Sequence, residues 1–211
     1  MHHGVVHLHA EFVPPPELRQ ALGGLVRGLE PAVDEPVARR GLLGRRTAAP
    51  AAVAGPQLVV EDVERMVLPI TDFGYLASTD AHRVVDALDA ALADLPAPRV
   101  RVGGGAALVD EADRCIWAEL TDADGDSGGL REVAQRVVSA IEPLGLFRDR
   151  RQFKTRFAIA TITDDTTLEH LEAVLAALES FDAEPWLADE IVVLQRGSGP
   201  WRSVTVGSGR S

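Results

Sequence analysis

Two segments of the chain share one pattern, in which a run typical of a β-strand is followed within a few residues by an amphipathic helix. The first run is Met66–Leu76 and the second is Arg151–Thr163. Behind each run, apolar residues recur at the spacing of one helix face, namely Val84, Val85, Leu88 and Leu92, and then Leu168, Leu171, Leu175 and Leu178. A repeated unit of strand, turn and helix restricts the chain to folds that contain both element types in two comparable halves.

The remaining elements connect through short turns. Val5–Phe12 alternates between apolar and polar residues, as a half-buried strand does, and prolines then open a helix. The other predicted strands are Leu58–Val60, Val100–Val102, Arg114–Leu120, Trp186–Gln195 and Pro200–Val206, with a bend at Gly103–Gly105 and a further helix from Leu130. Short connections favour antiparallel sheets, so we expect one α+β domain over residues 1–211 rather than a parallel doubly wound sheet.

Glu30–Pro56 lacks periodicity and reads as a long loop or insertion. It carries two arginine pairs, Arg39-Arg40 and Arg45-Arg46. These pairs could reach an anionic ligand, or they could simply be solvated loop charge.

Composition limits the classes of partner. The formal net charge is −11, so a broad nucleic-acid surface is excluded, because such a surface must be basic, whereas a small basic cleft is still possible. No apolar stretch approaches the ~20 residues of a membrane span, and no secretory signal is visible, so we expect a cytoplasmic protein. The single cysteine, Cys115, lies in a predicted strand and is interpreted as a small hydrophobic residue rather than a nucleophile.

Three polar residues alternate along the first strand. His7, His9 and Glu11 fall on one face. Two imidazoles and a carboxylate can bind zinc or iron, and they can also act as acid and base. The simpler reading is a wet sheet face, and we predict no metal and no cofactor.

The order of elements resembles the two-histidine phosphoesterase superfamily, and within it the bacterial 2'-5' RNA ligase and cyclic phosphodiesterase group. The resemblance is carried by Val5–Leu22, Met66–Leu76 and Leu144–Thr163, and most specifically by Ala188–Arg196 with the following Gly-Ser-Gly-Pro. It implies a bilobal fold in which two antiparallel sheets line a central cleft, with helices outside.

The resemblance also implies where the chemistry should lie. Members carry His-x-Thr or His-x-Ser twice, with the histidines as acid and base on a phosphodiester and the hydroxyls holding phosphate oxygens. The matching positions here are Pro69-Ile70-Thr71 and Arg156-Phe157-Ala158. Proline does not titrate and arginine is always protonated, so both motifs are degenerate and standard two-histidine hydrolysis is not expected.

The degenerate strands could still bind a ligand. With an unbroken period of two, Thr71 and Phe73 would share the cleft face with Arg156, and Lys154 would lie one step along. A guanidinium can hold a phosphate or carboxylate with two hydrogen bonds. The alternative for Arg156 and Lys154 is a solvated turn paired with neighbouring acids.

Three functions follow as hypotheses. The first is a divergent member of the group that binds a small anionic ligand, such as a nucleotide or phosphorylated metabolite. The second is an enzyme with relocated chemistry on His7, His9 or Glu11. The third is a non-catalytic interaction protein that contacts its partner through Glu30–Pro56.

Overall fold

The strands form two antiparallel sheets. The computed structural model describes residues 5–30, 55–109, 113–123, 128–146, 153–196 and 199–207. The first sheet has the order β3 (Leu68–Ala77), β1 (Val5–Phe12), β8 (Glu190–Gln195) and β9 (Gly199–Thr205). The second sheet has the order β2 (Leu58–Val60), β6 (Arg156–Ile162), β5 (Arg114–Asp122), β4 (Arg99–Val109) and β7 (Trp186–Leu187).

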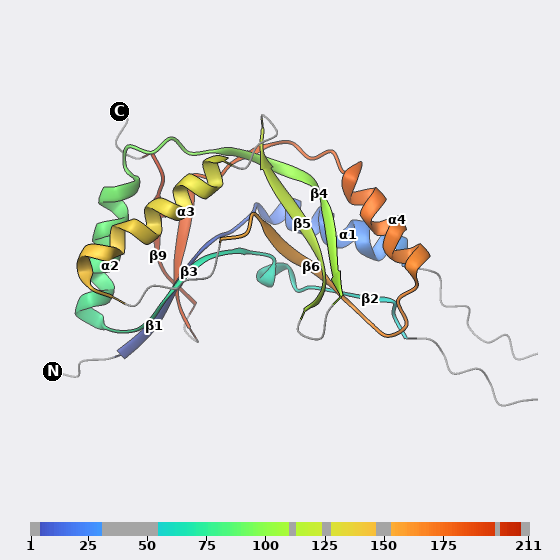
Figure 1. The fold of residues 1–211 in the computed structure, drawn as a ribbon, viewed down its shortest axis with the longest axis horizontal. Coiled ribbons are helices and arrows are strands. Elements are labelled where there is room, and N and C mark those ends of the chain that lie inside the picture. The colour runs from blue at the N-terminus through green and yellow to red at the C-terminus, as the bar shows by residue number, and fades with distance from the viewer. Residues whose placement is uncertain are drawn as a thin grey trace, which may run out of the picture.

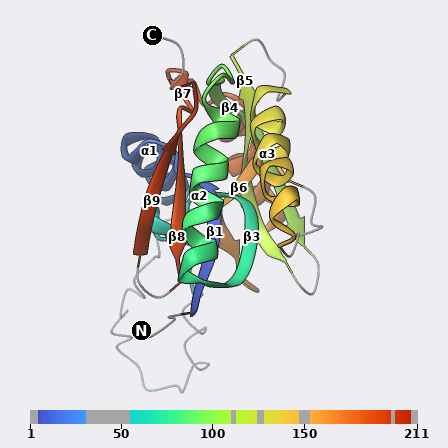
Figure 2. The same cartoon turned by 90° about the vertical axis from the view of Figure 1, so that its left-hand side faces the viewer.

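Each sheet is covered on one side by a pair of helices (Figures 1 and 2). The helices α2 (Ser78–Leu92) and α3 (Gly128–Ile141) contact each other and the first sheet, and α1 (Pro16–Leu29) and α4 (Leu168–Glu179) contact each other and the second. Short 3-10 turns lie before β3 (η1, Val63–Arg65) and after α3 (η2, Glu142–Leu144). The predicted α+β class, antiparallel sheets and outer helices are confirmed.

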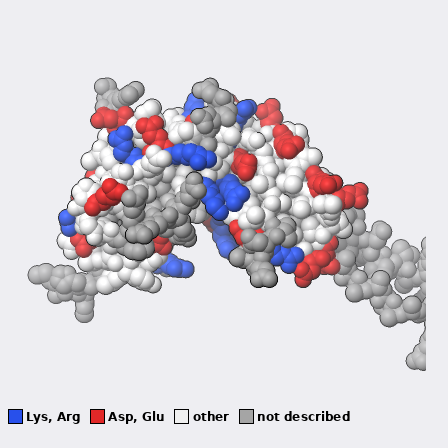
Figure 3. All heavy atoms as spheres, in the orientation of Figure 1, with Lys and Arg blue, Asp and Glu red and all other residues white. Residues whose placement is uncertain are grey.

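Alternation along the strands decides which face each side chain takes. In the first sheet, Leu8, Val193 and Val204 are fully buried on the side that meets the helices. In the second sheet, Phe157 and Ile159 are buried in the same way. The opposite faces carry polar residues, and Figure 3 shows the molecular surface hollowed between the two lobes, with Lys and Arg side chains gathered near the middle of that view.

The ends of the predicted long loop are held together. The carboxylate of Glu30 accepts hydrogen bonds from the backbone N–H of Leu58 at 2.7 Å and of Gln57 at 3.2 Å. The end of α1 and the start of β2 are therefore held side by side. Residues 31–54, including both arginine pairs, lie outside the described residues, so the hypothesis of a partner surface there stays a prediction.

Two local predictions are wrong. Trp186–Gln195 is not one strand, because it divides into β7 in the second sheet and β8 in the first. Gly103–Gly105 does not bend the chain out of the sheet, because β4 continues to Val109 with only a register shift between Val102 and Gly104. A glycine is needed at Gly105 since α4 approaches there, and a Cβ on it would lie 2.4 Å from Leu178 Cδ1.

Candidate functional site

A β-bulge changes the direction in which side chains point on β3, the strand that holds the first motif position, Pro69-Ile70-Thr71. The register of β1 with β3 shifts between Ala10 and Glu11, so that Ile70 has no partner on β1. Ile70 and Thr71 are then both buried, at 7% and 5% exposure, and alternation restarts one residue later. An extra residue of this kind moves the following side chains to the other face. The effect ends at a second register shift, between Leu8 and His9 on β1, where Phe73 has no partner.

The bulge removes two predicted ligand contacts from the cleft face. Pro69 is exposed, but Thr71 turns to the buried side and its Oγ1 has no hydrogen-bond partner. Phe73 is fully buried in the hydrophobic core, so it cannot touch a ligand in the cleft. Asp72, which the sequence reasoning passed over, takes the position opposite His9 instead.

On β6, the strand that holds the second motif position, the side chains alternate between the two faces of the sheet as predicted. Arg156 and Ala158 alternate with the buried Phe157 on β6, and they pair across the sheet with Glu119 and Trp117 respectively. The guanidinium carbon of Arg156 lies 4.9 Å from the centre of the Trp117 ring, within the range of a cation–π contact. Lys154 is exposed just before the strand.

Two buried donors at this position have no protein partner. They are Nε of Arg156 and Nε1 of the Trp117 indole. Among the described residues, no carboxylate forms an ion pair with Arg156. Because buried N–H groups are normally paired, these two donors mark a place where an acceptor from outside the chain can bind.

The histidines of β1 are each paired with a carboxylate. His7 Nε2 lies 3.3 Å from Asp72 Oδ1, and the His7 ring packs edge-on against Tyr75 with centroids 4.6 Å apart. His9 Nε2 lies 3.7 Å from Glu11 Oε2. The three residues predicted to share a face are thus brought together with Asp72.

Burial changes the acidity of this group. It lowers the pKa of His9 from 6.5, although Asp72 opposes the effect. It raises the pKa of Glu11 to about 7, although the Arg19 guanidinium opposes that rise. A carboxyl group with a pKa near neutral can accept or donate a proton at working pH.

The metal and thiol possibilities are limited by geometry. No three His, Cys, Asp or Glu side chains among the described residues are arranged to hold a metal ion, and this covers His7, His9 and Glu11. Burial, assisted by Asp113, raises the pKa of the Cys115 thiol to about 11, which makes it a poor nucleophile.

Membrane insertion through a helix finds no support in the described part of the chain. None of its helices combines the length and the apolar character that crossing a bilayer requires.

Trp117 and Asp72 are the residues that sequence reasoning missed. Trp117 could have been identified from the sequence, because it lies in the predicted strand Arg114–Leu120. Asp72 could not, because its position depends on a bulge that the sequence of β3 does not indicate.

No protein-family model matches this chain, and no curated protein matches it. Solved structures do. TT0787 of Thermus thermophilus is 14% identical with a TM-score of 0.56, over 97% of this chain and 100% of that one. LigT of Escherichia coli with 3'-AMP is 13% identical with a TM-score of 0.58, over 96% and 99%. A phosphoesterase is 15% identical with a TM-score of 0.52, over 96% and 99%.

At these identities the likeness establishes the fold and leaves the activity open. It spans nearly the whole of every chain compared, so both lobes are included. The protein has the LigT fold.

Proposed function

We propose that the protein binds a small anionic ligand, a nucleotide or phosphorylated metabolite, in its cleft without two-histidine hydrolysis. The observation that carries the proposal is the pair of unpartnered buried donors on Arg156 and Trp117. Arg156 supplies the charge, and Lys154 adds a second cation at the exposed edge.

The fold supports this choice of ligand. Solved LigT structures include complexes with 3'-AMP, phosphate, NADP+ and ATP. The second motif strand here keeps a cation on the open face of its sheet, and the aromatic surface of Trp117 lies beside it. A nucleotide is recognised by a cation that binds its phosphate and an aromatic ring that stacks on its base.

Hydrolysis by the family's mechanism is not part of the proposal. The two motif positions hold Pro69 and Arg156, and neither side chain can exchange a proton near neutral pH. The site therefore retains the means to hold an anion but lacks the paired acid and base.

The test is a calorimetric titration of 3'-AMP, a 2',3'-cyclic nucleotide and inorganic phosphate into wild type and Arg156→Ala. Loss of a charge-assisted hydrogen bond costs about 1.5–3 kcal/mol, so we expect at least a tenfold fall in affinity. Arg136→Ala is the matched control, because Arg136 is an exposed arginine on α3. Equal affinities for wild type and Arg156→Ala would remove Arg156 from the site.

A second variant tests the indole. Trp117→Phe keeps an aromatic face but deletes the unpartnered Nε1–H. We expect a fall of about fivefold for ligands with a phosphate, corresponding to one hydrogen bond of about 1 kcal/mol. An unchanged affinity would show that this donor does not face the ligand.

A second candidate function is acid–base catalysis with groups relocated to β1. It is favoured by the 3.3 Å contact of His7 with Asp72 and by the pKa of about 7 of Glu11. His7 oriented by a carboxylate would act as base, and Glu11 as acid. Phosphodiesterase and transferase screens of wild type, His7→Ala and His9→Ala decide it, and absence of any activity in wild type would reject it.

A further inference from the structure

A cavity of about 670 Å³ lies on the β8–β9 side of β1. Its wall comes from the end of β1, the start of α1, η1, the link between β7 and β8, and the start of β9. A volume of this size suits a small molecule. Neither Arg156 nor Trp117 lines it, so it is separate from the anion site proposed above.

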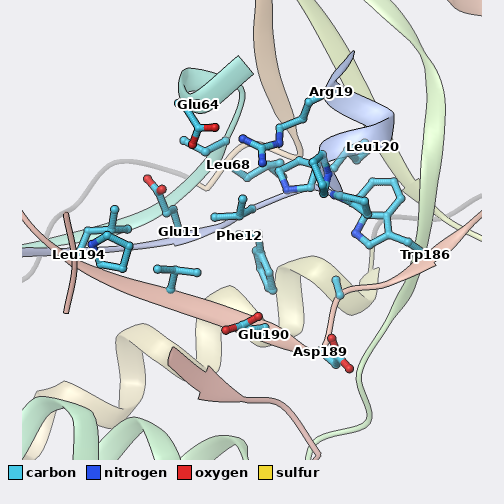
Figure 4. A pocket seen from close by; sticks show the side chains of 18 of the residues that line it. Glu11, Phe12, Arg19, Glu64, Leu68, Leu120, Trp186, Asp189, Glu190 and Leu194 are labelled. Carbon is cyan, nitrogen blue, oxygen red and sulfur yellow. The ribbon is translucent and has the colours of Figure 1, made fainter. Parts of the chain in front are cut away.

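The charge of the lining is mostly negative. Its ionisable side chains are four carboxylates and one guanidinium, from Glu11, Glu64, Asp189, Glu190 and Arg19. Figure 4 shows Arg19 and Glu64 on one side of the cavity, and Asp189 and Glu190 on the opposite side. This balance favours a cationic occupant over an anionic one.

Two of these side chains are almost completely buried. Glu11 is 8% exposed and Arg19 is 6% exposed. Glu11 Oε2 lies 3.7 Å from His9 Nε2, and the Arg19 guanidinium attracts the carboxylate, but no hydrogen bond is formed to that carboxylate among the described residues. Nη1 of Arg19 donates to the carbonyl of Val63 at 2.6 Å, but its Nε has no partner.

Unsatisfied buried groups are costly unless something binds them. Nε of Arg19 is such a group among the described residues, and an acceptor on a ligand would satisfy it. The Glu11 carboxylate lines the cavity, where a charged donor on the same ligand can reach it. Trp186 adds an aromatic wall, and Phe12 and Leu194 add apolar ones. An aromatic wall stabilises an organic cation further.

We propose that this cavity binds a small organic ammonium compound that also carries a hydrogen-bond acceptor such as a hydroxyl. The ammonium group lies against Glu11 with the rim carboxylates around it, and the acceptor reaches Arg19. The proposal is independent of the anion site, and either can fail without the other.

The affinity of the cavity for a cation should depend on pH, because binding is linked to the ionisation of Glu11. The groups that face Glu11 are His9 on β1, Arg19 on α1, Glu64 on η1 and Glu190 on β8. With a pKa of about 7 in the free protein, Glu11 must ionise to pair with a cation. Affinity should therefore rise about fourfold between pH 6.5 and pH 8.5.

The test uses three probes of equal length that differ in charge. They are 4-amino-1-butanol, 1,4-butanediol and 4-hydroxybutyrate, titrated into the full chain by ligand-observed NMR. We expect the amine to bind at least tenfold more tightly than the diol or the anion. Equal binding of the diol or the anion, or no binding of the amine, overturns the proposal.

Variants locate the binding. Glu11→Gln should weaken amine binding at least fivefold at pH 8 and abolish the pH dependence, whereas Glu172→Gln, on the exposed side of α4, should change nothing. Should Glu11→Gln fail to fold, Glu190→Gln at the exposed rim should still weaken binding about twofold. Unchanged affinity in the folded variants overturns the proposal, and Arg156→Ala should leave amine binding intact.

Discussion

Replacing Glu11 by glutamine should change how the stability of the protein depends on pH. Burial raises the pKa of Glu11 from 4.5 to about 7 in the folded protein. Between these two values the unfolded chain releases a proton that the folded chain keeps. The folded state is therefore increasingly disfavoured as pH rises from 4.5 to 7, and the loss is complete above 7.

The magnitude follows from the shift. Between pH 5 and pH 8, Glu11 should lower the free energy of unfolding by at most about 2.5 kcal/mol. Water in the adjoining cavity screens the carboxylate, so we expect about 1.5–2.5 kcal/mol. Glutamine keeps the shape but cannot ionise, so this part of the pH dependence disappears in Glu11→Gln.

Urea unfolding of wild type and variant at pH 5 and pH 8 measures the effect. At each pH, the free energy of unfolding of wild type is subtracted from that of Glu11→Gln. Subtracting the value at pH 5 from the value at pH 8 then removes any effect of the amide that does not depend on pH. Glu172→Gln, an exposed position on α4, should give a difference near zero. A difference near zero for Glu11→Gln as well would refute the reasoning that this carboxyl is strongly desolvated.

Three further predictions test other parts of the structure. Burial lowers the pKa of His9, so its NMR titration should have a midpoint below 6.5, and a higher midpoint would contradict the burial of the ring. The Cys115 thiol has a pKa of about 11 against an ordinary value of 9.0, so at pH 8 iodoacetamide should modify it about 100-fold more slowly than a peptide thiol; a similar rate would be inconsistent with this environment. Gly105→Ala places a Cβ against Leu178 and should cost about 1–3 kcal/mol in urea unfolding, whereas Gly28→Ala, with nothing within 4 Å, should be neutral or stabilising; equal effects would argue against the close approach of α4.

Much of the fold could be predicted because its signals are periodic and local. The alternation of Val5–Phe12 and the helical stripe after Met66–Leu76 each define one element without help from the rest of the chain. Prediction failed where tertiary contact overrides local preference. The glycines of β4 are tolerated in a strand because α4 packs closely on Gly105.

Helix starts show the same limit. Two neighbouring threonines precede α4, and its cap is Thr167, whose hydroxyl accepts from the backbone N–H of His170. The Thr166 hydroxyl instead bonds to the carbonyl of Gln57, more than 100 residues away in sequence. Neighbouring threonines are locally equivalent, so only the long-range partner distinguishes them.

Of the candidate site, the residues on β6 could be predicted from the sequence and those on β3 could not. Arg156 could be placed because β6 keeps a regular alternation from Arg156 to Ile159. Thr71 and Phe73 could not, since a single bulged residue, Ile70, turns them toward the core. Bulges depend on pairing with another strand, and the pairing of β3 with β1 is a tertiary fact.

The most direct test of the account is a phosphorus NMR time course of a 2',3'-cyclic nucleotide mixed with the wild-type protein. Among the described residues, Arg156 and Trp117 carry buried donors without partners, and the two motif positions hold Pro69 and Arg156 in place of imidazoles. We predict that the phosphorus resonance broadens or shifts on binding while no monophosphate resonance appears. Appearance of a monophosphate resonance, or a cyclic-nucleotide resonance that the protein leaves sharp and unmoved, would contradict the account.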